Sequence, residues 1–274
     1  VLTTYQHHFI DIPTGVLVGC LVLWLLPWQG NQTATFAVFR LPSNPFLSLP
    51  KPKRSPVHWR WVWLYASGVV VLSLLAFRLQ AAWYGLLWPT LALLWLAAVY
   101  GHADAAAWQK QATGKHTLAV SLFALPLRLM SRANMAYWLR GKALSAQVTE
   151  RIHVGSVLAV PDFHAVVDVC AEYPLAVMPS YYATIPMLDM VPADVAALRA
   201  AADALHQMLQ QQNQPVLVCC ALGYSRSVAV VLVYLLRQRH AHDLQAALKR
   251  LQQARPDMVV SPVNQQQILK AAHE

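Results

Sequence analysis

The stretch from Val216 to Ser227, with the sequence VLVCCALGYSRS, constrains the fold of this chain more than any other feature. The segment 215–219 is short, apolar and rich in valine, as is typical of a buried strand. The segment 228–236 is also apolar and is long enough to form a helix. Cys220 is therefore expected at a turn from a strand into a helix. Backbone N–H groups of such a turn can surround an anion, and the positive end of the helix faces the same point. The turn predicts a phosphate-binding loop that also favours a nucleophilic thiolate.

The run from Cys220 to Ser227 has the pattern C-x5-R-S, which resembles the signature of the cysteine-based protein tyrosine and dual-specificity phosphatases. The family usually has His before its nucleophile, and here that position is Cys219. The resemblance implies that Cys220 attacks phosphorus, that Arg226 binds two phosphate oxygens and that Ser227 donates a hydrogen bond to the departing sulfur. The phosphate-binding loop would comprise Ala221, Leu222, Gly223, Tyr224, Ser225 and Arg226. The alternative is a buried strand cysteine beside a helix-capping serine and a surface arginine.

Such a phosphatase also needs an acid that protonates the leaving oxygen. Asp189, in IPMLDMVPAD, lies 31 residues before Cys220, a spacing that fits the family. Asp194 is the alternative acid, but it precedes a helical run and is more simply an N-cap. Neither a metal nor a cofactor is expected.

The cysteines, Cys20, Cys170, Cys219 and Cys220, show neither metal-ligand spacing nor a disulfide framework. A reducing compartment is expected, because a reactive thiolate beside a second thiol would otherwise be oxidised. Cys170 ends a predicted strand and is either a resolving thiol for the nucleophile or simply packed. Cys219 is a second candidate, although adjacent cysteines form a disulfide only with backbone strain.

The composition is too apolar for a wholly soluble protein, with 57% hydrophobic and only 12% charged residues. The net charge of +9 belongs to the first half: residues 1–142 hold 12 Lys and Arg against 2 Asp and Glu, and residues 143–274 hold 9 against 10. This distribution suits cytoplasmic loops and anionic lipid head groups. It gives no basic stripe for nucleic acid in the second half.

Residues 1–105 are predicted to form a membrane region with three helices, at about 10–29, 61–79 and 82–101. The proline-rich loop at residues 40–60 is basic, so the positive-inside rule places it in the cytoplasm. The phosphatase half would then also be cytoplasmic, on a multi-pass protein of the bacterial inner membrane. Because the first residue is Val1 and not Met, residues before it are expected in the natural protein.

The string from His7 to Gly15, H-x3-D-I-x-x-G, resembles the last catalytic motif of the type 2 phosphatidic acid phosphatase superfamily. His7 and Asp11 lie four residues apart and would project from one helical face. The resemblance implies a remnant of a lipid phosphatase domain that uses a phosphohistidine intermediate. The alternative is an interfacial His/Asp pair that caps a helix.

Residues 106–146 are predicted to form an interfacial amphipathic linker on the inner leaflet. The apolar stretch 118–130 within it is broken by Pro126 and Arg128. The alternative, a fourth crossing at this stretch, would move the phosphatase half to the other side of the membrane.

Residues 147–274 are predicted to form an α/β three-layer sandwich of the dual-specificity phosphatase type, which the resemblance covers over nearly its whole length. An edge strand is expected at 151–154 and core strands at 165–170, 176–178 and 215–219, with helices at 195–211, 228–236, 243–252 and 264–272.

The expected function is that of a membrane-anchored phosphatase that hydrolyses phosphate monoesters through a phosphocysteine intermediate. Its partners would be membrane lipids and a phosphorylated substrate, either a phosphoprotein or a lipid phosphate. Two alternatives stay open: a catalytically weak membrane anchor that binds phosphorylated ligands, and a lipid phosphatase whose activity resides in the His7/Asp11 region.

Overall fold

The computed structural model describes residues 15–16, 19, 57–79, 83–102 and 105–273. His7 and Asp11 lie outside the described residues, as does nearly all of the predicted crossing at 10–29.

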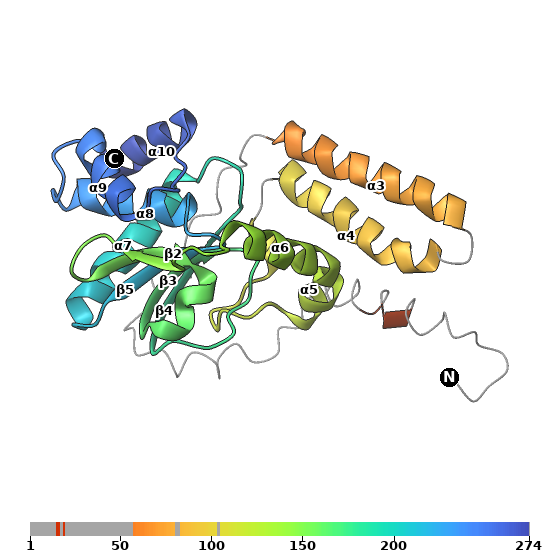
Figure 1. Cartoon of the computed structure of the whole chain (residues 1–274), viewed down its shortest axis with the longest axis horizontal. Coiled ribbons are helices and arrows are strands. Elements are labelled where there is room, and N and C mark those ends of the chain that lie inside the picture. The colour runs from red at the N-terminus through yellow and green to blue at the C-terminus, as the bar shows by residue number, and fades with distance from the viewer. Residues whose placement is uncertain (1–14, 17–18, 20–56, 80–82, 103–104, 274) are drawn as a thin grey trace.

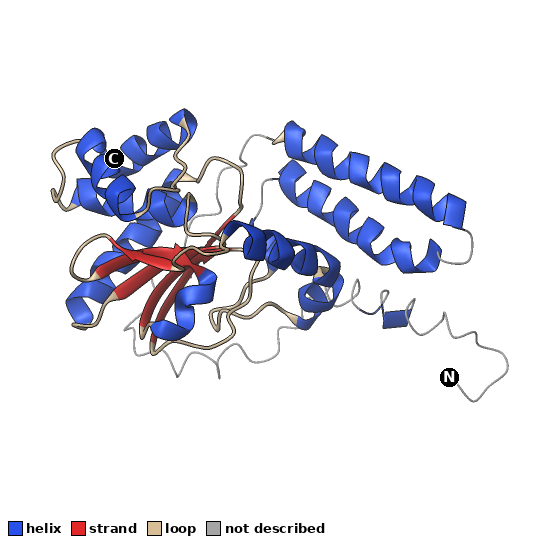
Figure 2. Ribbon diagram, viewed as in Figure 1, coloured by secondary structure: helices blue, strands red, loops and turns tan. Residues whose placement is uncertain are grey.

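A mixed five-stranded sheet forms the centre of the second half of the chain (Figure 2). Its strands stand in the order β1-β2-β5-β3-β4, and only β1 runs antiparallel to its neighbour. The bounds are β1 Ser145–Gln147, β2 Ile152–Ser156, β3 Ala165–Cys170, β4 Tyr181–Met187 and β5 Val216–Cys220. The valine-rich strand that leads to Cys220 is thus the central one, buried on both faces, as its continuous apolar sequence predicts.

Two strand predictions are wrong. The strand at 152–156 is interior rather than an edge, because β1 pairs with its outer side. Residues 176–178 form no strand: they lie between Pro174 and Pro179, and both Val177 and Met178 are exposed. The strand comes later as β4, which contains Pro186; a proline is tolerated there because β4 is an edge strand of the sheet.

Helices cover one face of the sheet, and α8, at Arg226–Arg237, lies closest to its centre. The others are α7 Val195–Gln211, α9 Leu244–Ala254 and α10 Pro262–His273. All residues of α8 from Arg226 to Leu235 are buried, so the helix that follows the Cys220 loop is packed on every side. The opposite face is covered by the 3-10 helix η5, Val157–Asp162, and by the carboxyl end of α6, Leu125–Trp138.

Two long apolar helices, α3 Trp59–Leu79 and α4 Trp83–His102, run side by side as a hairpin (Figure 1). Their bounds agree closely with the predicted crossings at 61–79 and 82–101. Among the described residues, only α3, over Trp59–Arg78, is both long and apolar enough to cross a membrane, and the apolar part of α4, Gly85–Gly101, is shorter. A multi-pass membrane region therefore stays a prediction.

Two further helices occupy the predicted interfacial linker. Helix α5, Leu118–Phe123, has 6 residues and α6 has 14, and they meet at Ala124, because Pro126 begins a new helix in its first turn. Neither is long enough to span about 30 Å of hydrocarbon, which argues against a fourth crossing at 118–130.

The segment before α5 is packed onto the sheet through buried polar contacts. Lys110 Nζ lies 2.6 Å from Asp168 Oδ2, and both side chains are fully buried. Tyr182 donates its hydroxyl to the same carboxylate at 2.8 Å, and His116 Nε2 lies 2.9 Å from the Ala171 carbonyl. The segment at 105–117, which begins with the 3-10 helix η4, Ala105–Trp108, is thus joined to the sheet by an ion pair as well as by apolar packing.

Candidate active site

Cys220 ends the central strand β5, and its side chain is almost fully buried beneath the following loop. The Gly223 N–H donates to Cys220 Sγ at 3.3 Å, and Ser227 Oγ lies 3.4 Å from the same sulfur. The first N–H groups of α8 have no partners within the helix and face the loop. The predicted strand-to-helix turn therefore exists, with hydrogen-bond donors around a single sulfur.

Gly223 allows the loop to lie directly on β2. Its φ is +77°, and a Cβ added there would come within 2.4 Å of the Gly155 carbonyl carbon. Only glycine combines this left-handed conformation with such a close backbone approach. Next to this contact, buried Ser156 donates its hydroxyl to the Ala221 carbonyl at 2.5 Å. The loop is thereby fixed to the end of the neighbouring strand.

Arg255 holds the outer side of the loop. Its guanidinium donates to the Leu222 carbonyl at 3.0 Å and to the Ala143 carbonyl at 2.6 Å, and it lies over the Tyr224 ring at 4.8 Å. The Val259 N–H donates to the Tyr224 carbonyl at 2.8 Å. The Leu222 and Tyr224 carbonyls of the loop are thus bound by residues that follow the loop in sequence, and these bonds help to fix its conformation. The sequence reasoning did not assign a role to Arg255, although the segment ARPDMVV belongs to the stretch that resembles the family.

Arg226, the first residue of α8, is almost fully buried and bound by two carboxylates. Its Nη1 lies 3.0 and 2.8 Å from the two oxygens of Glu172, and its Nη2 lies 3.3 Å from Asp189 Oδ1. The same Nη1 donates to the Met187 carbonyl at 2.7 Å. Burial disfavours the charge, but Asp189 and Glu172 more than offset this and raise the pKa of Arg226 well above its ordinary value. The guanidinium is held rigidly as a cation.

Glu172 was missed by the sequence reasoning, although it connects most of the site. Besides Arg226, it accepts the Asp189 N–H at 2.9 Å and the Cys170 thiol at 3.2 Å. Burial works against ionisation, but the Arg226 charge prevails and lowers the pKa of Glu172. Its position in the sequence was a signal, because Glu172 lies two residues after the end of strand β3, at the carboxyl edge where α/β folds place their sites.

Asp189, in the segment after β4, is the predicted acid that lies next to Arg226. Its side chain remains 40% exposed. Desolvation of the carboxyl group, together with the negative charge of Glu172, raises the pKa of Asp189 against the lowering effect of Arg226. Asp194 instead accepts the Ala197 N–H at 3.1 Å as the N-cap of α7. The two candidates thus lie in different environments, and only Asp189 contacts the arginine of the loop.

Cys170 and Cys219 are buried free thiols near the site. Burial raises the pKa of both thiols well above the ordinary value, and Cys170 donates to Glu172. Their redox role stays a prediction.

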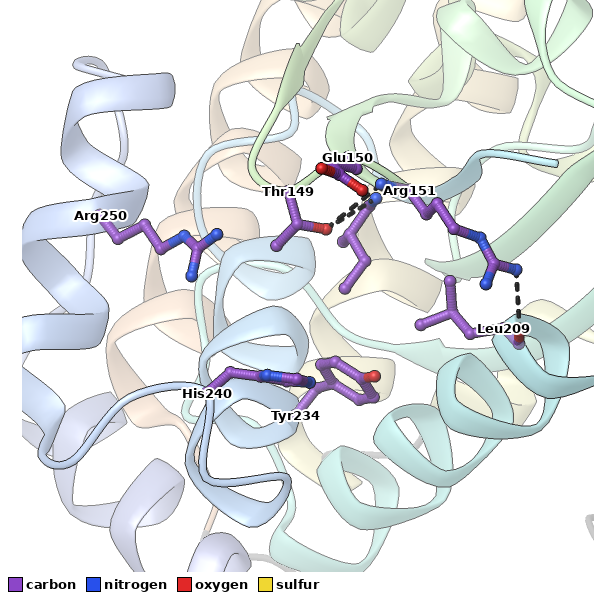
Figure 3. A pocket seen from close by; sticks show the side chains of 8 residues that line it. Thr149, Glu150, Arg151, Leu209, Tyr234, His240 and Arg250 are labelled. Atoms are coloured by element: carbon purple, nitrogen blue, oxygen red, sulfur yellow. Dashed lines mark hydrogen bonds between the residues drawn. The ribbon is translucent and has the colours of Figure 1, made fainter. Parts of the chain in front are cut away.

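A pocket of about 400 Å³ lies away from Cys220, beside α8 and the amino end of β2 (Figure 3). Arg151 and Arg250 line it, but both guanidinium groups donate to backbone carbonyls: Arg151 to those of Leu209 and Gln212, and Arg250 to that of Val148. These arginines therefore bind carbonyl groups at the ends of a helix and a strand, and neither is free to bind a ligand in the pocket through those N–H groups.

In the described part of the chain, no three His, Cys, Asp or Glu side chains are grouped to hold a metal ion.

Residues 148–274 match the family model described as the catalytic domain of dual specificity phosphatases. Among solved structures, human DUSP28 is similar, with 26% identity over 47% of this chain and 93% of that chain and a TM-score of 0.42. A mouse putative dual specificity phosphatase, complexed with zinc tungstate, is 25% identical over 48% of this chain and 89% of that chain, with a TM-score of 0.43. No curated protein matches the chain.

Proposed function

We propose that this chain, a phosphoric monoester hydrolase whose residues 148–274 form a dual-specificity phosphatase catalytic domain, removes phosphate from substrates presented at a membrane surface. One observation carries the catalytic part. Cys220 Sγ lies within hydrogen-bond distance of the Gly223 N–H and of Ser227 Oγ, at the amino end of the helix whose first residue is Arg226. Nucleophile, anion-binding donors and a fixed guanidinium thus converge on one loop.

In the first step, the Cys220 thiolate attacks phosphorus in line with the leaving oxygen. The S–P bond forms and the P–O bond to the leaving group breaks, while Asp189 transfers its proton to the departing oxygen. Arg226 and the loop N–H groups stabilise the equatorial phosphate oxygens, and the planar guanidinium matches two of them. The raised pKa of Asp189 suits this step, because the acid must hold its proton until the bond breaks.

In the second step, water attacks the phosphocysteine. Asp189, now ionised, takes a proton from the water, the P–O bond forms, and the S–P bond breaks to release inorganic phosphate. Ser227 donates a hydrogen bond to the departing Cys220 sulfur, to which it is already adjacent. The cycle then begins again with the thiolate and the protonated acid.

The surface of α3 supports the proposal of membrane anchoring. One face of the helix exposes apolar side chains along its length, for example Val71 at 62% and Phe77 at 84%. Trp59 and Trp63, near the end of the helix that lies toward the phosphatase domain, are exposed as well, as in an interfacial aromatic belt. We place the domain at the cytoplasmic head-group level, which the basic first half of the chain favours.

A lipid phosphate monoester is the substrate class that we favour. The loop residues Ala221, Leu222 and Tyr224 are uncharged, so the loop offers no lysine for additional phosphates. Two exposed apolar side chains flank the site, Met190 beside Asp189 and Val259 against the loop. Anchoring next to the lipid would raise the effective concentration of such a substrate.

Turnover of 4-nitrophenyl phosphate by the full chain in detergent tests the catalytic part. Replacement of Cys220 by Ser should abolish turnover, because a serine hydroxyl is a far poorer nucleophile than a thiolate at neutral pH. Undiminished activity in this variant would refute the proposal and direct attention to His7 and Asp11. Binding of phosphorylated ligands without turnover by the natural sequence would instead favour the non-catalytic alternative.

The substrate class is tested with two matched substrates. Phosphate release is measured from vesicles that contain a glycerophospholipid with a terminal phosphate monoester, and from a phosphotyrosyl peptide in solution. We expect the vesicles to be the better substrate. Activity on the peptide with none on the vesicles would contradict the lipid assignment and leave a protein phosphatase.

A further inference from the structure

The base of the α3–α4 hairpin contacts the segment that carries Asp189. We call Leu188–Val191, which follows β4, the acid loop. The Trp61 indole N–H of α3 donates to the Met190 carbonyl at 3.0 Å, and the Tyr100 hydroxyl of α4 donates to the Asp189 carbonyl at 3.1 Å. Both donors lie at the same end of the pair, where α3 begins and α4 ends (Figure 1).

Apolar packing accompanies these two hydrogen bonds. Leu188 is buried in one cluster with residues of α4, including Tyr100, and Val191 packs against the same cluster. The Trp61 and Tyr100 rings lie 6.1 Å apart, so the two donors also support one another. The acid loop therefore rests on the hairpin with its apolar side chains as well as with its carbonyls.

The backbone of the acid loop is held from two sides. The Asp189 N–H donates to Glu172 of the phosphatase domain, whereas the Asp189 and Met190 carbonyls accept from the hairpin. Met190 has a φ of +61°, a left-handed conformation that is uncommon for a residue with a side chain and that needs support from its surroundings. The hairpin supplies part of this support.

We propose that Trp61 and Tyr100 are positioning residues for the reaction, which makes the base of the apolar hairpin a part of the active site. They act through the acid loop, by holding Asp189 where its proton can reach the leaving oxygen. This inference rests on the proposed function, because it takes Asp189 to be the acid. It also means that the domain at 148–274 is incomplete without the helices that precede it.

The test uses the full chain in detergent with two conservative variants, Trp61→Phe and Tyr100→Phe. The first removes the indole N–H, and the second removes one hydroxyl and leaves the ring. Trp88→Phe is the matched control, because the Trp88 indole also donates to a backbone carbonyl at 3.0 Å, that of Phe123 in α5, away from the acid loop.

The readout is kcat/KM on two substrates that differ in their need for an acid. Phenyl phosphate has a poor leaving group, which must be protonated as it departs, and 4-nitrophenyl phosphate has a good one. Loss of a hydrogen bond that positions the acid should lower kcat/KM on phenyl phosphate by about tenfold and change it on 4-nitrophenyl phosphate far less. Trp88→Phe should leave the ratio between the two substrates unchanged. A merely destabilised protein would lose both activities in the same proportion.

Asp189→Asn separates the failure of this inference from failure of the proposed function. If Asp189→Asn shows the selective loss on phenyl phosphate and the two hairpin variants do not, the positioning role is refuted and the proposed mechanism stands. If Asp189→Asn shows no selective loss, Asp189 is not the acid and the proposed mechanism itself is refuted. Selective loss in Asp189→Asn, Trp61→Phe and Tyr100→Phe, with the ratio unchanged in Trp88→Phe, is the expected result.

Discussion

At the scale of single residues, the site depends on how the charge of Arg226 is compensated before substrate arrives. Glu172 contacts Nη1 with both carboxylate oxygens, and Asp189 contacts Nη2. A buried guanidinium without such partners would be costly. The arrangement leaves Arg226 in one orientation, so little reorganisation is needed when a phosphate binds.

Removal of the Glu172 charge should therefore damage stability and activity together. Glu172→Gln keeps the size of the side chain but leaves Arg226 and the Asp189 N–H with a weaker acceptor. We expect a loss of about 3 kcal/mol in the free energy of unfolding, measured with urea, and at least a roughly tenfold lower kcat/KM. Asp203→Asn is the control, since it breaks a half-exposed pair with Arg237 and should cost less than about 1 kcal/mol. Full activity in Glu172→Gln would contradict the role given to this carboxylate.

The raised pKa of Asp189 predicts a particular pH dependence. A general acid works only while protonated, so kcat/KM on phenyl phosphate should fall as pH rises through the pKa of Asp189. Because that pKa lies above the ordinary value of 3.8, the fall should begin at a higher pH than an exposed aspartate would give. Asp189→Asn should lack this descending limb, whereas titration of the substrate affects both proteins equally. A limb that persists unchanged in Asp189→Asn would assign it to another group.

At the scale of secondary structure, the sequence predicted those elements whose own apolar pattern determines whether they form a strand or a helix. The valine-rich strand, the loop with Gly223 and the apolar helix after it lie where they were predicted, as do α3, α4 and α7. The sequence predicted a strand at 176–178 instead of β4, because Pro186 makes the sequence of β4 look unlike a strand. Strand β1 was not predicted, because its three residues are too few to show a periodic pattern. Whether a strand is an edge depends on its partners, which the local pattern does not contain.

The contacts between distant segments were beyond sequence reasoning. Glu172 meets Arg226 across 54 positions, and Trp61 meets Met190 across 129. Polar residues of these types occur on many surfaces, and only the folded chain shows which of them are brought together. The same holds for Lys110, which local composition assigned to an interfacial linker but which is buried against Asp168.

The Lys110–Asp168 pair should fix the segment 105–117 to the sheet. Burial opposes the charge of Lys110, but Asp168 prevails and raises the pKa of the amine. Lys110→Met should leave a buried carboxylate without its cation and cost about 3 kcal/mol in urea unfolding. Adding Asp168→Asn should restore part of this loss, because the amide is neutral and still meets the Cys170 N–H and the Tyr182 hydroxyl. Lys142→Met, at an exposed pair with Asp257, should change stability little. Equal effects of Lys110→Met and Lys142→Met would contradict this account.

At the scale of the whole molecule, the hairpin and the phosphatase domain meet at the acid loop. On the proposed account, the exposed apolar face of α3 lies in the bilayer, and its tryptophan-rich end stands at the level of the active site. A phosphate at the membrane surface would then be within reach of Cys220. The chemistry at Cys220 is the claim on which this whole arrangement depends.

The most direct test of that claim is to trap the covalent intermediate. The full chain is mixed with a phosphate monoester, quenched rapidly in denaturant at mildly alkaline pH, where both phosphocysteine and phosphohistidine persist, and digested. The phosphorylated residue is then located by mass spectrometry. The account predicts phosphate on the sulfur of Cys220, with none in Cys220→Ser. Phosphate on His7, or continued turnover by Cys220→Ser, would contradict it.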